Sequence, residues 1–542
     1  MEPAVGSDRD RNVKILRSTW RFALAGAVAV GAALATGELA AGLLPGVPSP
    51  LLAVARFIVD IQPPGAKELV VALFGEADKV AFQVFIVLVA VAVGAGLGLL
   101  ARTRLELATW VIALFAGAGF LASLRDPGVG APLAAAAAAV QVVVGVVVLR
   151  RLVGLAAQGE VPIRSTAEGT PAGSAAADQR RGMPDWSRRT LLQAGGAIAV
   201  GSVAAGTLGR ILLERQRAPV ATGSIPPAAL PASLPGGADI ATTDLTAAGL
   251  SPIVVPNAAF YRIDTAFIPP TVDRSTWRLK VTGLVDREVE LTYDELVALP
   301  IIEQFVTIAC VSNEVGGSLV GNALWTGVAL RTVLDMAGVQ ASADQLVGSS
   351  VDGFTAGMPV EWVMDESRVP MIAVGMNGEP LPREHGYPAR LIIPGLYGYV
   401  SATKWLTELR LTRFDQFEAF WIPRGWAVRA PVLTQSRIDV PRSGSNVTAG
   451  RVPVAGVAWA PDRGIEGVEV RIDEGEWARA KVSAPISNAT WVQWLYDWNA
   501  TPGSHRIDVR AIDGTGEVQT DSRSAPAPDG ARGHHRIQVT AA

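Results

Sequence analysis

Five apolar stretches in the first part of the chain are long enough to cross a lipid bilayer, and they constrain the fold more than any other feature. They cover residues 20–44, 80–101, 105–124, 131–149 and 191–213. Each is close to the ~20 residues that a helix needs to cross the hydrocarbon core. The last is rich in glycine, which is common in membrane helices. The sequence therefore predicts about five transmembrane helices: four within residues 1–157 and a fifth within 190–213.

Basic residues near these stretches predict how the chain crosses the membrane. They precede the first stretch (11–21), lie between the second and third (102–104), follow the fourth (150–151) and precede the fifth (180–189). Cytoplasmic segments carry the excess of Lys and Arg, so the N-terminus is predicted to be cytoplasmic. Five crossings then place everything after about residue 214 outside, in a multi-pass protein of the cell membrane.

The segments between the predicted helices have different characters. Residues 50–75 hold two apolar pieces separated by prolines, each too short to span, so they are predicted to be interfacial or re-entrant. Residues 158–189 form a Pro-, Gly-, Ala- and Ser-rich linker that is predicted to be disordered and cytoplasmic. It ends in Ser187-Arg188-Arg189-Thr190, which resembles a twin-arginine export signal, although arginines before a membrane helix also fit the charge rule alone. Residues 214–250 are expected to be an extracytoplasmic tether without a core-forming pattern.

Composition excludes several classes of function and site. The net charge of −3 gives no reason to expect nucleic-acid binding. The single cysteine, Cys310, excludes an intrachain disulfide, a four-cysteine iron–sulfur cluster and a cysteine-based zinc site. No histidine precedes His385, so the predicted membrane helices cannot bind haem through histidine pairs.

Cys310 follows an apolar run, 305–309, that is typical of a buried strand, and it precedes a Ser-Asn-Glu-Val-Gly-Gly turn. This order places the thiol at the end of a sheet, where ligand sites commonly lie. The alternative is a structural role, because free cysteine often behaves as a small buried hydrophobe.

The sequence around this cysteine resembles the molybdopterin-binding domain of the sulfite oxidase family. The resemblance begins with CVSNEVGG at 310–317 and continues through Gly321-Asn322-Ala323 and Trp325-Thr326-Gly327-Val328. Further motifs follow in the family's order: Asp352-Gly353, MNGEPLP at 376–382, HGYPAR at 385–390, PGLYG at 394–398 and Lys404-Trp405. The resemblance covers about residues 260–426. It implies molybdenum and molybdopterin as cofactors, with the soft thiolate of Cys310 as the metal ligand.

The resemblance also implies roles for individual residues. Arg and Lys side chains hold phosphate, and glycines let the backbone approach a pterin. The expected cofactor-binding residues are Tyr261, Arg262, Cys310, Ser312, His385, Arg390, Gly395, Gly398 and Lys404. The expected catalytic residues are Cys310, Asn313 and Phe417. His385 has a plainer alternative as a hydrogen-bonding loop residue.

Two departures from the family's pattern concern the substrate. Sulfite oxidases carry arginine close behind the cysteine, whereas this chain has Asn313-Glu314-Val315. Phe417 stands where the family's active-site tyrosine is expected, and a phenyl ring cannot donate a hydrogen bond. The resemblance therefore implies oxygen-atom transfer on a small substrate, as sulfite-type oxidation or sulfoxide-type reduction. Electrons would pass to or from a quinone or a soluble carrier.

The second half of the chain is expected to hold two domains. Residues 251–426 mix strands and helices, with an alternating strand at 277–284, a helix at 292–299 that begins with a capping box, and an amphipathic helix at 328–337, so an α+β domain is predicted. Residues 427–542 read as short strands separated by turns, which predicts an all-β, immunoglobulin-like sandwich. It resembles the family's dimerisation domain and implies a possible homodimer. Two alternatives remain: a non-enzymatic, membrane-tethered binding module, and a transporter with an accessory exported half.

Overall fold

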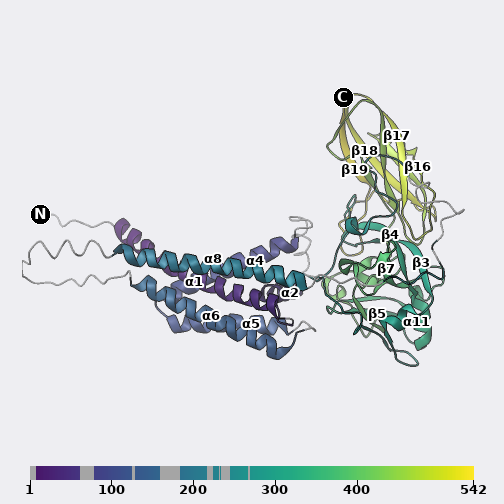
Figure 1. The fold of residues 1–542 in the computed structure, drawn as a ribbon. Coiled ribbons are helices and arrows are strands. Elements are labelled where there is room, and N and C mark those ends of the chain that lie inside the picture. The colour runs from purple at the N-terminus through teal and green to yellow at the C-terminus, as the bar shows by residue number, and fades with distance from the viewer. Residues whose placement is uncertain are drawn as a thin grey trace, which may run out of the picture. The chain divides into compact units, whose positions relative to one another are not determined.

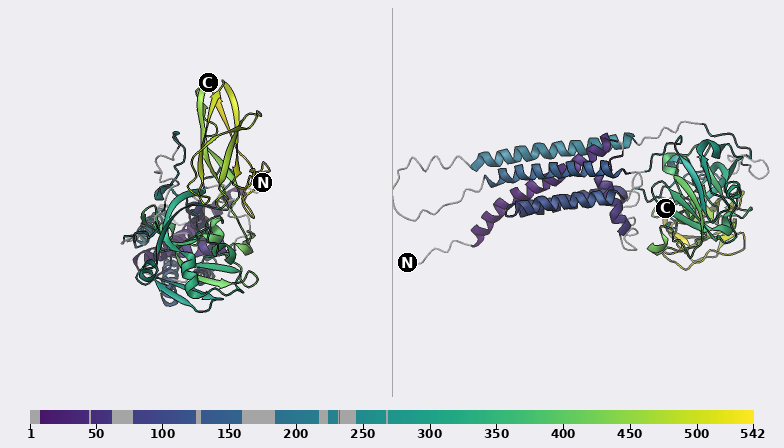
Figure 2. Two further views of the ribbon diagram at one scale, coloured as in Figure 1. Left: turned by 90° about the vertical axis from the view of Figure 1, so that its right-hand side faces the viewer. Right: turned by 90° about the horizontal axis from the view of Figure 1, so that it is seen from below.

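The chain forms two units, Met1–Ala218 and Pro219–Ala542, drawn in Figures 1 and 2. The computed structural model describes residues 8–44, 46–61, 78–124, 129–158, 184–216, 224–230, 232, 245–266 and 269–542. The first unit is helical and the second holds all the strands of the described residues. We describe each unit by itself.

The helical unit contains five helices that are long and apolar enough to cross a membrane. Each predicted apolar stretch lies in one of them. The helices are α1 (Asp8–Leu43), α4 (Asp78–Ala101), α5 (Leu105–Ser123), α6 (Ala131–Ala157) and α8 (Pro184–Gln216). The first apolar piece of residues 50–75 is the short helix α2 (Pro50–Ile61), while residues 62–77 and 159–183 lie outside the described residues.

Small residues let the long helices approach α1 closely, and the ribbons of α1, α4 and α8 lie side by side in Figure 1. A Cβ atom added to Gly209 of α8 would lie 2.4 Å from the carbonyl oxygen of Glu38 on α1. On α4, a Cβ atom at Gly98 would lie 1.8 Å from the carbonyl oxygen of Phe22. Because neither contact leaves room for a side chain, backbone packs on backbone here, as is usual between membrane helices.

Polar contacts show which helix ends lie together. Arg150 near the end of α6 donates to both carboxylate oxygens of Glu106 at the start of α5, at 3.0 and 3.1 Å. At the other end, Glu38 of α1 accepts hydrogen bonds from Ser49 Oγ at 2.6 Å and from the Leu51 N–H at 3.1 Å, and its second oxygen lies 3.5 Å from Arg210 of α8. The connection between α4 and α5 therefore lies at the same end of the unit as the end of α6.

The second unit begins with an α+β domain built on two sheets. One has the strand order β2-β1-β10-β5-β6, and the other has the order β3-β4-β7-β8 with β9 paired to β7. The strands are β1 (Arg278–Gly283), β2 (Val289–Thr292), β3 (Ile301–Ala309), β4 (Val320–Ala329), β5 (Gln345–Ser350), β6 (Thr355–Pro359), β7 (Met371–Met376), β8 (Glu379–Pro380), β9 (Arg390–Ile392) and β10 (Leu406–Thr412).

Two predicted helices of this domain are present with different bounds. The first is α10 (Tyr293–Val297), and Thr292 and Glu295 form the predicted capping box at its start. The second, α11 (Leu330–Ala337), begins two residues later than predicted, because Val328 and Ala329 still pair with β7. The short helices α12 (Val360–Val363) and α13 (Gly398–Ser401) complete the domain.

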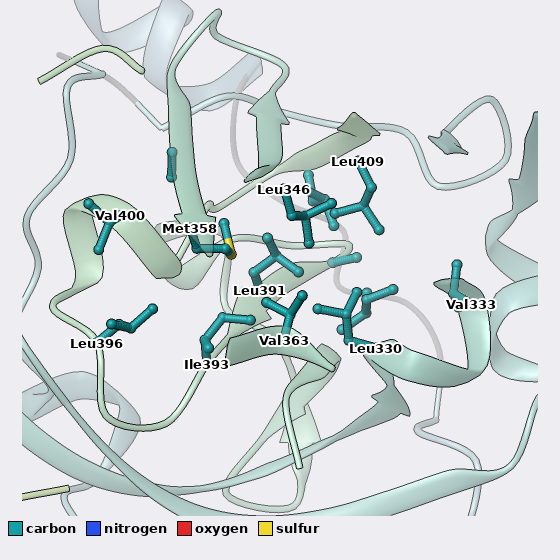
Figure 3. Close-up of a cluster of buried hydrophobic side chains, with 14 of the residues drawn as sticks. Leu330, Val333, Leu346, Met358, Val363, Leu391, Ile393, Leu396, Val400 and Leu409 are labelled. Atoms are coloured by element: carbon teal, nitrogen blue, oxygen red, sulfur yellow. The ribbon is translucent and has the colours of Figure 1, made fainter. Parts of the chain in front are cut away.

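One continuous core holds the strands that carry the later motifs. Leu330 of α11, Leu346 of β5, Leu391 of β9 and Leu409 of β10 are fully buried in one cluster, and Figure 3 shows these side chains close together. Burial of such a side chain stabilises the fold by about 1.5–3 kcal/mol. Leu391 therefore fixes β9, and with it the neighbouring Arg390.

The C-terminal part is an all-β sandwich of a four-stranded sheet, β11-β13-β17-β16, and a five-stranded sheet, β12-β19-β18-β14-β15. Apolar side chains of both sheets, Val454, Trp494 and Val509 among them, form its core. The strands are β11 (Gln435–Val440), β12 (Asn446–Val447), β13 (Gly450–Trp459), β14 (Ile465–Ile472), β15 (Ala478–Arg479), β16 (Lys481–Val482), β17 (Val492–Ala500), β18 (Gly503–Asp513) and β19 (His535–Ala541). An all-β sandwich was the expectation from the alternating pattern.

The α+β domain and the sandwich meet along β3. Trp491 of the sandwich donates its backbone N–H to Thr307 Oγ1 at 2.7 Å and its indole N–H to the Ile253 carbonyl at 2.8 Å. Thr307 in turn donates its own N–H to the Ala489 carbonyl at 2.9 Å. These groups are buried and mutually satisfied, so they fix the junction firmly.

Residues 224–230, within the predicted tether, contact the α+β domain although their sequence has no core-forming pattern. Leu230 forms a parallel bridge with Ile302 of β3, the Glu303 N–H donates to the Leu230 carbonyl at 2.9 Å, and Ile225 packs against the core. The physical reason is that β3 is an edge strand with unpaired backbone groups, and an extended segment of any composition can pair with such an edge.

Candidate functional site

Cys310 lies where β3 ends, at the first position of the loop that leads to β4. The pairing of Ala309 with Val320 closes the β3–β4 ladder, and the Cys310 N–H donates to the Leu319 carbonyl at 2.9 Å. The cysteine is buried, with 9% of its surface exposed. The thiol is thus held at the end of a sheet, as the sequence predicts.

Asn313 closes this loop from within. Its side-chain Oδ1 accepts the Leu319 N–H at 2.8 Å, and its own N–H donates to the Cys310 carbonyl at 3.1 Å. Gly317 carries no side chain because a Cβ atom there would lie 2.5 Å from Asn313 Oδ1. Asn313 therefore shapes the loop that presents the thiol. Ser312 lies half-buried in the same loop, and Glu314 is exposed.

Aromatic rings line the neighbouring part of the site. Phe260 stacks on Tyr261, with ring centroids 5.3 Å apart, and contacts Trp325 and His385 edge-on at 5.9 and 5.6 Å. Trp325 lies on β4 and is fully buried. The rings thus connect the segment before β1, the cysteine hairpin and the His385 loop.

Arg390 is a buried cation whose described contacts include no carboxylate. Its Nη1 donates to the His385 carbonyl at 3.1 Å, and its guanidinium lies 4.9 Å from the centre of the Trp325 ring. Burial lowers the pKa of Arg390 to about 10, still high enough for it to be charged at neutral pH. Burying a charge without a counter-ion is costly, so such a cation is typical of a site for an anionic ligand.

His385 is buried and neutral. Its Nε2 lies 3.0 Å from the Asn257 carbonyl, which fixes the tautomer with the proton on Nε2 and leaves Nδ1 as an acceptor. Burial and the nearby Arg390 lower the pKa of His385 to about 4. The plainer alternative, a hydrogen-bonding loop residue, and the cofactor role are both compatible with this geometry.

Lys404 reaches the same loop from the other side. Its Nζ lies 3.0 Å from Asp264 Oδ2 and donates to the Glu384 carbonyl at 3.1 Å. Arg262 lies 3.6 Å from the same Asp264 oxygen. Gly386, with φ +113°, allows the approach: a Cβ atom there would lie 3.1 Å from the Cβ atoms of both Arg390 and Lys404.

Two buried tyrosines lie within electrostatic range of Cys310, and Tyr261 is also within range of Arg390. Burial raises the pKa of Tyr261, the charge of Cys310 raises it further, and the charge of Arg390 opposes the shift. Burial likewise raises the pKa of Tyr397 to about 12, and Cys310 adds to that shift. Both phenols are therefore protonated donors within electrostatic reach of the thiol.

The structure places Arg262, His385, Arg390 and Lys404 in one connected set of contacts, and Cys310, Ser312 and Asn313 in one loop. Gly398 lies beside the cysteine, since a Cβ atom there would be in ordinary van der Waals contact, 3.6 Å, with the Ala309 carbonyl. Gly395 has another role: a Cβ atom would lie 2.8 Å from Asp462 of the sandwich. Phe417 also has other neighbours, because its ring lies 4.9 Å from the guanidinium of Arg410 on β10, in the other sheet.

Sequence reasoning missed Tyr397, Phe260 and Trp325. Tyr397 lies inside the PGLYG segment between the two predicted glycines, and its hydroxyl accepts the Leu433 N–H at 3.4 Å. Phe260 precedes Tyr261, and Trp325 lies in a quoted motif. Their proximity to these motifs was the available signal. Only the fold shows that Phe260 and Trp325 are in contact and that Tyr397 lies within electrostatic range of Cys310.

The residues present fit a molybdopterin cofactor. In the described part of the chain, no group of three or more His, Cys, Asp and Glu side chains is placed to hold a metal ion. A metal at Cys310 would therefore need further ligands from a bound cofactor, such as pterin sulfurs. The buried Arg390 suits the pterin's phosphate, and Gly386 lets Lys404 pack close beside it.

Residues 266–421 match the family model described as the oxidoreductase molybdopterin binding domain. The uncharacterized oxidoreductase YuiH of Bacillus subtilis (strain 168) is 33% identical over 171 residues, which are 32% of this chain and 82% of that protein. Human mitochondrial sulfite oxidase is 27% identical over 317 residues, 50% of this chain and 58% of the human protein. This chain therefore spans a little over half the length of the curated sulfite oxidases that it matches.

Among solved structures, the sulfane dehydrogenase SoxCD from Paracoccus pantotrophus aligns with a TM-score of 0.46 and 23% identity, over 53% of this chain and 81% of that chain. The match of the family model covers the segment that carries Cys310, His385, Arg390 and Lys404. The chain belongs to the molybdopterin-binding oxidoreductases of the sulfite oxidase type.

Proposed function

We propose that the chain is a membrane-anchored molybdenum-cofactor oxidoreductase that transfers an oxygen atom to or from a small extracytoplasmic substrate. The observation that supports this most directly is that the buried Cys310 directly follows β3, while the buried Arg390 lies against Trp325 of the neighbouring strand β4, and both act electrostatically on Tyr261. The bound cofactor would supply two-electron oxygen-atom chemistry.

The protein's own residues would bind and orient the cofactor. Cys310 would hold the metal, while Arg390 and Lys404 would hold the phosphate. Asp264 keeps Lys404 in place by an ion pair at 3.0 Å, and Asn313 fixes the loop. Tyr261 and Tyr397 would donate hydrogen bonds near the reacting atoms, the role that the sequence predicts for the family's tyrosine and that Phe417 cannot fill.

Metal analysis tests the cofactor assignment. The full chain, purified from a host that makes the cofactor, is expected to contain about one molybdenum per chain, and Cys310→Ser is expected to lose the metal or its redox activity. Cys310→Ser is nearly isosteric, so circular dichroism should show an unchanged fold. A parent protein without molybdenum would refute the enzyme and leave the membrane-tethered binding module.

The substrate class is tested with the same preparation. Sulfite oxidation adds an oxygen from water and releases two electrons and two protons, and it is followed with an artificial acceptor. Sulfoxide reduction consumes two electrons and two protons and releases water, and it is followed with a reduced dye. We expect turnover in one of the two assays, and turnover in neither would refute this substrate range.

The positions of the basic residues support an extracytoplasmic catalytic unit. Arg102 and Arg104 lie in the connection between α4 and α5. The bond from Arg150 to Glu106 places this connection at the same end as the last turns of α6. If that end is cytoplasmic, α8 leads out of the membrane into the second unit. The Ser187–Thr190 segment, at the start of α8, would serve as the signal for export of a folded domain.

Single-cysteine labelling in a Cys310→Ser background tests this orientation. A membrane-impermeant maleimide is expected to label Asp521→Cys, in an exposed loop of the sandwich, in intact cells. Thr103→Cys, in the exposed connection between α4 and α5, is expected to react only after lysis. The reverse pattern would overturn the proposed orientation.

A membrane quinone is the electron partner that the helical unit favours. A cavity of about 290 Å³ is lined by α1, α2, α4, α5 and α6, almost entirely by apolar side chains, with Gln141 and Ser123 as polar groups. An apolar cavity with few polar groups is typical of a site for a lipid-soluble ring.

Electron exchange with quinone in nanodiscs should fail for Ala138→Phe, which fills the cavity, and persist for Ala139→Phe, whose side chain does not line it. Equal activity of the two variants would favour a soluble carrier.

A further inference from the structure

The loop that presents Cys310 is held from outside by two side chains of the β-sandwich. Arg437, on β11, donates from Nη1 to the carbonyl oxygen of Gly317 at 2.9 Å. His535, the first residue of β19, packs against Gly316: a Cβ atom added to this glycine would lie 2.3 Å from the imidazole carbon Cδ2. The α+β domain therefore does not define its own cysteine loop alone.

Two further partners, Asp439 and Ser251, fix Arg437 itself. Its Nε donates to Asp439 Oδ1 at 2.6 Å, and its Nη2 donates to Ser251 Oγ at 2.9 Å. Asp439 also accepts the Ser251 N–H, at 3.0 Å. Arg437 is 8% exposed. A buried guanidinium with this set of bonds has one conformation, so the position of the Gly317 carbonyl is set by the sandwich.

The imidazole of His535 is held in a fixed orientation where it contacts Gly316. Its Nδ1 accepts the backbone N–H of Ile438, the residue after Arg437, at 2.9 Å. This bond fixes the ring of a neutral histidine, and burial and the charge of Arg437 lower the pKa of His535 to about 4. Gly316 adopts φ +80°, which a residue with a side chain resists. Glycine is therefore required at 316 both by its conformation and by the imidazole.

These contacts are separate from those that join the two domains. Trp491, Thr307, Ile253 and Ala489 hold the junction along β3. Arg463 holds the sandwich side of the junction through Asp513 Oδ2 at 2.8 Å, Thr434 Oγ1 at 3.0 Å and the Val432 carbonyl at 3.1 Å. Removing Arg437 therefore leaves the main attachment of the domains in place.

We infer that Arg437 and His535 are positioning residues, which act through the Gly316–Gly317 backbone to fix the Cys310 thiol at the metal. The inference rests on the proposed function, because it takes Cys310 as the metal ligand. It assigns the sandwich a task within the catalytic unit that does not depend on dimer formation. A residue that orients a metal ligand typically changes affinity or activity about 10–100-fold when it is replaced.

The test uses the full-length holoenzyme and a spectroscopic readout. We expect Arg437→Ala to retain molybdenum but to change the Mo(V) electron paramagnetic resonance signal and to lower kcat by about 10–100-fold, with a smaller effect on KM. Arg437→Lys keeps the charge but cannot donate to Asp439, Ser251 and Gly317 in the same geometry. We therefore expect it to restore the signal and kcat only in part. Arg463→Ala, the matched loss of a buried sandwich arginine, should leave the signal unchanged.

Gly316→Ala perturbs the same contact without altering the sandwich, so it replaces Arg437→Ala if that variant fails to fold. It is expected to shift the same signal, and His535→Ala should partly reverse the shift by removing the steric clash. An unchanged signal and kcat in folded, molybdenum-loaded Arg437→Ala or Gly316→Ala would overturn the inference, as would an equal change in Arg463→Ala. A parent without molybdenum would instead overturn the proposed function, so the two failures are distinguishable.

Discussion

Replacing Arg390 with methionine separates the stability of the fold from its ability to hold a cofactor. Burial lowers the pKa of Arg390 from 12.5 to about 10. That lowering corresponds to a cost of about 3 kcal/mol for keeping the cation in the fold. Against this cost stand the hydrogen bond to the His385 carbonyl and the contact with Trp325. A hydrogen bond from a charged group contributes about 1.5–3 kcal/mol.

The two contributions nearly cancel. We therefore expect the free energy of unfolding of cofactor-free Arg390→Met to lie within about 2 kcal/mol of the parent's value. By contrast, Arg463→Met leaves the buried carboxylate of Asp513 without its ion-pair partner, which should cost about 3–5 kcal/mol. After loading in a competent host, Arg390→Met should retain little molybdenum, whereas the parent should be loaded.

Urea unfolding of the full chain in detergent, followed by tryptophan fluorescence, measures the free energy of unfolding. The signal reports mainly on the second unit, because only Trp20, Trp110 and Trp186 of the 14 tryptophans precede residue 219. Molybdenum analysis measures how much of the metal the parent and the variant retain after loading. A loss above about 4 kcal/mol in the cofactor-free variant would make Arg390 a structural residue. Parental molybdenum content in the variant would refute the phosphate-binding role.

Three further predictions concern other parts of the molecule. Leu330→Ala removes a fully buried side chain from the core of Figure 3 and should lower the free energy of unfolding by about 2–5 kcal/mol, measured by the same urea titration. His385 has a lowered pKa of about 4 in the fold, against 6.5 when unfolded, so its contribution is complete above pH 6.5 and is lost as the pH falls toward 4. Acidifying the cofactor-free protein from pH 7 to 5 should therefore cost about 2 kcal/mol more in the parent than in His385→Gln, and equal losses would contradict the assignment. Gly209→Val inserts a side chain where backbone of α8 meets Glu38 of α1, so thermal stability of the detergent-solubilised helical unit should fall, while Gly201→Val, in open space on the same helix, should be tolerated.

Local patterns predicted the parts of the fold that depend on neighbours in sequence. The five long helices follow from apolar length, β1 from alternation, and α10 from the Thr292–Glu295 capping box. The start of α11 was predicted two residues early because an apolar residue such as Val328 fits the pattern of either a strand or a helix. Only its pairing with Ile372 assigns it to β4.

The site was predicted as far as the motifs extend. Cys310, His385, Arg390 and Lys404 follow from the resemblance, and the structure places the last three in one connected set of contacts. The role of Asn313 in closing the loop was not apparent, since it depends on a bond to Leu319 across the turn. Arg437 lies 120 residues from Gly317 in sequence, so no local pattern connects them.

The pairing of residues 224–230 with β3 also determines how the second unit behaves when it is separated from the helices. β3 is an outer strand whose backbone groups are satisfied there by Leu230 and Ala229. A soluble fragment that begins at residue 245 would expose this edge to the same edge of another molecule, and exposed edges promote aggregation. A fragment that begins near Ala218 keeps the edge covered. Residues 224–230, between the helical unit and the enzyme domain, thus also protect this edge from self-association, and their removal should turn a monodisperse domain into one that aggregates.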